Sequence, residues 1–121
     1  MLPQSLNEPI AAYMTAWAAV REARKQRAVE RDAFDKAHAR TEELKRQAAE
    51  LLDQIRAGAD AAPKAIESLF DVEVEIQLST LRSNSLWNAE QSALVIENAT
   101  LLRLWLATAA VHNAIKAEVT R

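Results

Sequence analysis

The sequence has no cysteine, a single glycine and three prolines among its 121 residues. Without cysteine, neither disulfides nor thiol chemistry is available. With one glycine and three prolines the chain has few places to turn, which argues against β-sandwiches, barrels and βαβ units. One glycine also excludes a glycine-rich phosphate-binding loop. These absences predict an all-α protein built from long helices.

Aromatic residues and net charge are also low. The chain has two Phe, three Trp and one Tyr, and a formal net charge of −2, which is too small to predict a partner. The N-terminal residues lack the basic and apolar regions of a signal peptide. The most apolar run, residues 99–111, is interrupted by Arg103 and is too short to span a bilayer. We therefore expect a cytoplasmic protein without a transmembrane segment.

The only break rich in glycine and proline, Gly58–Pro63, divides the chain into two arms. Bulky apolar residues that are equally distant from this break pair up: Ile55 with Ile66, Leu52 with Leu69, Phe34 with Trp87, and Trp17 with Trp105. Two helices that run antiparallel and side by side need such a mirror. The chain is therefore predicted to be a long, coiled-coil-like antiparallel helical hairpin.

Helix boundaries follow from local signals. We expect one helix over residues 8–57, a turn over 58–63, and a second arm with helices over 64–82 and 86–119 in a single domain. Gly58 suits a left-handed helix end, and Pro63 suits a first helical turn. The second arm is expected to break or kink near 82–86, because Ser and Asn side chains compete for backbone hydrogen bonds.

Residues 72–78 alternate apolar and polar side chains, which is typical of a strand. No second strand-like segment is available to pair with them, and an isolated strand leaves its backbone groups unsatisfied. A helix is therefore the preferred interpretation. It would carry apolar residues on two flanks, one of them with Phe70, Val74, Leu78 and Leu81, as in a helix with more than one neighbour.

The last expected helix is apolar around more than half of its circumference, and one facing helix cannot bury so wide a surface. We expect a homodimer, with a bundle around Trp17 and Trp105, and a further protein partner. The candidate interface residues are Trp17, Trp87, Leu101, Leu104, Trp105, Val111 and Ile115.

Basic side chains gather in the first arm, and acidic ones lie opposite them in the second, so ion pairs between the arms are expected. One basic stripe, spaced by three and four residues, could line phosphates along a helix: Arg21, Arg24, Lys25, Arg27 and Arg31. Interleaved acidic residues and the lack of aromatic residues among the basic ones favour a solvent-facing, salt-bridged surface instead.

No catalytic or metal-binding pattern is present in the sequence. His38 and His112, the two histidines, lie far apart in the hairpin, and neither completes the Glu-x-x-His pattern of helical di-iron proteins. No serine has a histidine predicted nearby. We expect no enzyme activity, no cofactor and no metal.

The sequence therefore favours a non-catalytic structural or adaptor protein, such as a phage or mobile-element accessory or assembly factor. It would act through helix-mediated protein–protein interaction and self-assembly. The alternative is a regulator that binds nucleic acid, or a nucleic-acid-processing machine, through the basic stripe. A second alternative is an export chaperone or a membrane-surface protein.

Overall fold

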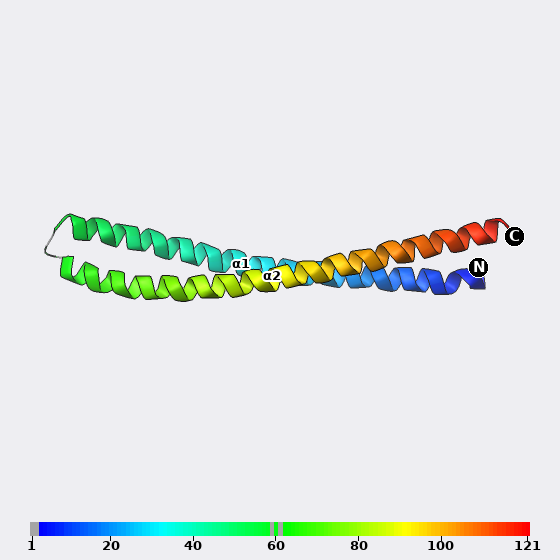
Figure 1. Ribbon diagram of the computed structural model, residues 1–121, viewed down its shortest axis with the longest axis horizontal. Coiled ribbons are helices and arrows are strands. Elements are labelled where there is room, and N and C mark those ends of the chain that lie inside the picture. The colour runs from blue at the N-terminus through cyan, green and yellow to red at the C-terminus, as the bar shows by residue number, and fades with distance from the viewer. Residues whose placement is uncertain (1–2, 59, 61) are drawn as a thin grey trace. The chain divides into compact units, whose positions relative to one another are not determined.

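The computed structural model describes residues 3–58, 60 and 62–121 of the chain, and nearly all of them are helical. Helix α1 spans Gln4–Arg56 and helix α2 spans Ala62–Val119. The two helices pack against each other, and the described residues contain no strand (Figure 1). The predicted all-α helical hairpin is confirmed, and residues 72–78 are helical.

The turn between the helices follows the predicted chemistry. Gly58 has φ +65°, the left-handed conformation that glycine adopts without steric cost. Its amide donates to the Ile55 carbonyl at 3.1 Å, which closes the end of α1. Pro63 lies in the first turn of α2, where its missing N–H costs nothing. Residues 59 and 61 of the predicted turn lie outside the described part.

Helix α1 begins earlier than predicted. It starts at Gln4 instead of residue 8, and the Leu6 amide donates to the Pro3 carbonyl at 3.0 Å. Ser5 lies inside the helix, and its hydroxyl binds the Glu118 carboxylate. Pro9 also lies inside α1, where it removes only one hydrogen bond close to the helix start.

The second arm was predicted to break or kink near residues 82–86, and the break is not present. Helix α2 is one continuous element through this segment, so it replaces the two helices expected over 64–82 and 86–119. The serines and asparagine there do not displace the backbone hydrogen bonds. Ser83 is buried, and its hydroxyl lies 3.4 Å from the Thr41 hydroxyl of α1. With an interhelical partner available, this side chain has no need to compete with the helix.

Buried and half-buried side chains recur along both helices at alternating intervals of three and four residues, the heptad spacing of a coiled coil. We call these positions the seam. In α2 the seam runs through Ala65, Leu69, Val72, Ile76, Ser79, Ser83, Leu86, Glu90, Ala93, Glu97, Thr100 and Leu104. Several of its members are small, polar or charged, so the seam buries less apolar surface than a leucine-rich one.

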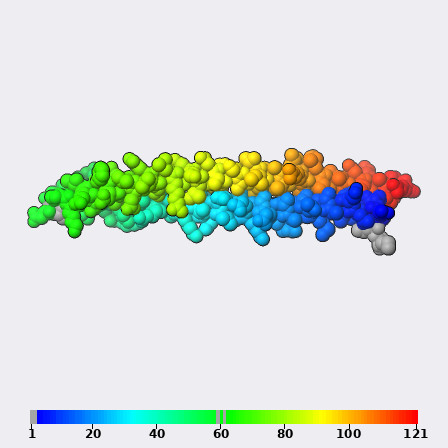
Figure 2. All heavy atoms as spheres, turned by 90° about the horizontal axis from the view of Figure 1, so that it is seen from below, coloured from blue at the N-terminus to red at the C-terminus, as the bar shows by residue number. Residues whose placement is uncertain are grey.

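The chain divides into two compact units. Unit 1 comprises Met1–Val29 and Glu90–Arg121, and unit 2 comprises Glu30–Ala89. Within each unit the atoms of α1 and α2 lie directly against one another, as the space-filling view shows (Figure 2). Unit 1 buries Leu6, Val20, Ala23, Ala93 and Leu104, and unit 2 buries Leu44 and Ala65.

Three hydroxyl groups meet in the seam of unit 2. The Thr41 hydroxyl donates to the Ala37 carbonyl at 3.1 Å. It also lies 2.5 Å from the Ser79 hydroxyl and 3.4 Å from that of Ser83. Because the Thr41 proton is used by Ala37, both serines can donate to the Thr41 oxygen. This hydroxyl cluster satisfies polar groups that would otherwise be costly to bury.

Candidate interaction surfaces

Trp87 contacts Phe34 across the hairpin in unit 2, as the mirror of residue numbers predicts. The two ring centroids lie 5.3 Å apart and the rings are tilted by 55°. Such a tilted arrangement is favourable between aromatic rings. Trp87 nevertheless remains 42% exposed, so one side of its ring is open to solvent. Trp87 therefore packs within the hairpin and still exposes part of its apolar ring.

The predicted interface residues of unit 1 differ in their exposure. Leu104 is only 9% exposed and belongs to the seam, so it packs inside the hairpin. Trp105, the next residue, is 67% exposed. Ile115 is also exposed, whereas Trp17, Leu101 and Val111 are half-buried. Trp17 also lines an open hollow of about 350 Å³ together with Met14 and Arg21.

A row of apolar side chains in unit 2 lies on the face of α2 that points away from the seam. We call it the 66–81 stripe, and it consists of Ile66, Phe70, Val74, Leu78 and Leu81. Phe70 is 71% exposed and Leu78 is 62% exposed. The spacing of four, four, four and three residues places all five side chains on one side of the helix.

A second apolar row lies on α2 in unit 1. We call it the 95–106 stripe, and it consists of Val95, Ala99, Leu102, Trp105 and Leu106. All five are exposed, and Val95, Ala99, Leu102 and Leu106 are separated by four, three and four residues. This is a heptad spacing on the face opposite the seam, so each unit carries apolar surface that α1 does not cover.

The two stripes have different charged neighbours. The 66–81 stripe is flanked by exposed acidic side chains, namely Glu67, Asp71, Glu73 and Glu75. Glu75 also pairs with Arg40 of α1 at 3.2 Å. Beside the 95–106 stripe, Arg103 is exposed and is the only Asp, Glu, Lys or Arg between residues 98 and 115. One stripe is thus acidic at its edges and the other is weakly basic.

The basic stripe is largely engaged within the chain. Arg24 and Arg27 reach the Glu97 carboxylate at 3.9 and 3.2 Å, and Glu97 is buried. Arg31 pairs with Asp35 at 3.2 Å, and its guanidinium lies 6.0 Å from the centre of the Phe34 ring. Arg21 and Lys25 are exposed on α1. The ion pairs expected between the arms are confirmed, and they reduce the charge that this stripe offers to phosphates.

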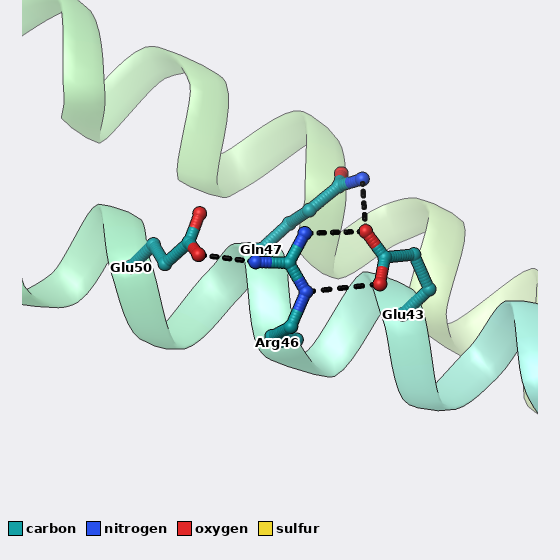
Figure 3. A network of polar contacts seen from close by, with 4 residues as sticks. All are labelled: Glu43, Arg46, Gln47 and Glu50. Carbon is teal, nitrogen blue, oxygen red and sulfur yellow. Dashed lines mark hydrogen bonds and ion pairs between the residues drawn. The ribbon is translucent and has the colours of Figure 1, made fainter.

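A network of charged and polar side chains on α1 perturbs the pKa of Glu43. Arg46 donates from Nε to Glu43 at 2.9 Å and from a second nitrogen at 2.5 Å, and it also binds Glu50 (Figure 3). Gln47 donates to Glu43 at 3.4 Å. The hydrogen bonds from Arg46, followed by that from Gln47, lower the pKa of Glu43 from 4.5 to about 2. Such a local network of side chains three and four residues apart stabilises a helix surface.

The histidines do not form a site. His38 is exposed and stacks on Phe34, with ring centroids 5.8 Å apart. His112 is exposed on α2. Among the described residues, no group of three or more His, Asp or Glu side chains is placed to hold a metal ion.

Helix α2 has one feature of a membrane span. It contains an 18-residue window with a mean hydropathy of 1.4, of which 17% is buried, so by length and composition it is able to cross a membrane. The core helix of a soluble protein can pass the same test, and the expectation of no transmembrane segment stays a prediction.

Comparison of the chain with models of known protein families, with curated proteins and with solved structures found no match.

The sequence pattern predicted the apolar flank that contains Phe70, Val74, Leu78 and Leu81, but these residues were not among the predicted interface residues. Their spacing along the sequence would have indicated an interface. In a helix of a two-helix hairpin, the seam takes one face, so a second apolar row at helical spacing has no partner in the chain.

Proposed function

We propose that this chain is a non-catalytic structural or adaptor protein that self-assembles through the outward face of α2. The observation that carries the proposal is the apolar character of that face in both units. The 66–81 stripe and the 95–106 stripe are exposed, although α1 already covers the seam face of the same helix. Soluble proteins seldom leave contiguous apolar surface bare.

The amount of exposed surface supports the same proposal. The chain exposes 8852 Å², whereas a compact folded protein of 13.4 kDa exposes roughly 6,500 Å². The excess is well above the roughly 800 Å² that each partner contributes to a standard interface. Assembly would bring the exposed area towards that of an ordinary folded protein.

The experiment is light scattering on a size-exclusion column at low and high salt. We expect a mass above that of one chain under both conditions, because apolar contacts resist screening. The paired change Leu78→Glu and Leu102→Glu places one charge in each stripe and should reduce the mass to that of a monomer. Both side chains are exposed, so the hairpin itself should keep its helix content in circular dichroism.

A matched control uses two exposed positions of α1, Ala39→Glu and Ala49→Glu, which add the same charge outside the stripes. This variant should retain the mass of the wild type. A wild-type chain that is monomeric at all concentrations up to the millimolar range would overturn the proposed function.

A further inference from the structure

The two stripes on α2 have complementary patterns. This inference rests on the proposed self-assembly and names its geometry. We propose that the 66–81 stripe of one copy packs antiparallel on the 95–106 stripe of a second copy, so that α2 pairs with α2.

The apolar side chains of the two stripes match in position. When the copies are aligned so that Leu78 of one faces Leu102 of the other, the neighbouring apolar residues of the stripes also face one another. Val74 meets Leu106 of the second copy, and Leu81 meets Ala99 of the second copy. Opposed residues in an antiparallel pair have numbers with a constant total, and these three pairs share the same total. Two of the pairs bring branched apolar side chains together, and the third places Leu81 against the small Ala99.

Charged residues lie at one edge of this contact. In the same alignment, Arg103 of the second copy lies near Glu75, and both are exposed.

Charge favours pairing between the two different stripes over pairing of one stripe with itself. Pairing the 66–81 stripe with the same stripe of another copy would oppose Asp71, Glu73 and Glu75 to their own counterparts. Like charges that face one another are destabilising. Pairing with the 95–106 stripe avoids this, since Arg103 is the one charge beside that stripe. Charge complementarity therefore favours unit 1 of the second copy as the partner of the 66–81 stripe.

Exchanging the two copies exchanges the stripes, so the same contact is available a second time, between unit 1 of the first copy and unit 2 of the second. Between the stripes, the exposed Asn88 faces the exposed Ser92 of the second copy, whereas Ser85 faces Val95. The pair of Asn88 and Ser92 favours this alignment over others, because a shifted alignment buries these polar side chains against apolar ones.

The test uses the absence of cysteine from the chain, which allows single sites to be labelled. Variants Leu78→Cys and Leu102→Cys are prepared separately, and each is treated with a short bis-maleimide, alone and as a mixture. A reagent is preferred to direct oxidation because neighbouring helix axes lie about 8–10 Å apart, which is long for a disulfide. We expect cross-linked dimers in the mixture and at least 5-fold less in either variant alone.

The control site is Ala39→Cys, exposed on α1 and outside both stripes. It should give no dimer with either variant. Strong cross-linking of Leu78→Cys alone would indicate that a stripe pairs with itself, and would overturn the inference. So would the absence of a cross-link in the mixture.

Light scattering on the same samples distinguishes the two levels of the proposal. A dimer mass without the Leu78–Leu102 cross-link means that the copies associate in another way, so the inference fails and self-assembly stands. A monomer mass in every sample means that the proposed function fails.

A charge exchange gives a second readout that does not depend on labelling. Arg103→Glu should raise the dissociation constant of the dimer about 2- to 30-fold, because two symmetric exposed ion pairs are lost. Adding Glu75→Arg should restore at least half of this loss in a double-mutant cycle. Purely additive effects would contradict the proposed neighbours.

Discussion

At the scale of single residues, the contacts of Glu43 make a prediction about pH. The Arg46 and Gln47 donors lower its pKa from 4.5 to about 2 in the folded chain. A lowered pKa in the folded state means that the carboxylate adds stability above pH 4.5, and that this contribution is lost as the pH falls from about 4.5 through about 2. Arg46→Gln should return the pKa of Glu43 towards 4.5 and make stability less dependent on pH in this window.

The measurement is an NMR titration of the Glu43 side-chain carboxyl, together with urea unfolding at several pH values. Lys45→Gln is the matched control, since it removes an equal charge from α1 but leaves the donors to Glu43 in place. A titration midpoint of Glu43 that is the same with and without Arg46 would show that the network does not form in solution.

Residue types also explain which parts of the structure could be predicted. The helix end at Gly58 was predicted correctly, because the turn needs a backbone conformation that only glycine adopts readily. The contact of Phe34 with Trp87 was also predicted correctly, because each is a large ring with one matching ring opposite. Ser83 contributed to the wrong prediction of a helix break. The preference of serine for turns is a local property, whereas the burial of Ser83 depends on Thr41 in the other helix. Leu104 and Trp105 are both apolar, and only the seam periodicity of the folded hairpin separates core from surface.

At the scale of helices, the contact between Phe34 and Trp87 tests the alignment of α1 with α2 in unit 2. Replacing both residues with alanine in a double-mutant cycle should reveal a coupling of about 0.5–1.5 kcal/mol, because the ring centroids lie only 5.3 Å apart. The free energies come from urea unfolding of the four chains.

The control cycle pairs Phe34→Ala with Trp105→Ala, since Trp105 lies about five turns further along α2. Its effects should be additive. Additive effects in the cycle of Phe34 and Trp87 would argue against the alignment of the two helices.

At the scale of the whole molecule, the proposed self-assembly would make thermal stability depend on protein concentration. Because only folded chains associate, the Tm should rise by about 3 °C for each tenfold increase in protein concentration. The measurement is circular dichroism or calorimetry over a hundredfold range of concentration. The variant with Leu78→Glu and Leu102→Glu should lose this dependence, whereas the variant with Ala39→Glu and Ala49→Glu should keep it. A wild-type Tm that does not change with concentration would contradict assembly.

The ion pair between the buried Glu97 and the half-buried Arg27 restricts how the two helices can slide along one another. A heptad repeat looks the same to itself after a shift of seven residues, so apolar periodicity alone lets one helix move past the other by a heptad. In unit 1 such a slip would take Glu97 away from Arg27 and leave a buried carboxylate uncompensated. In unit 2 it would separate Thr41 from Ser79. These polar contacts specify the register of α1 against α2, which the apolar periodicity alone leaves open, and each unit has one of its own.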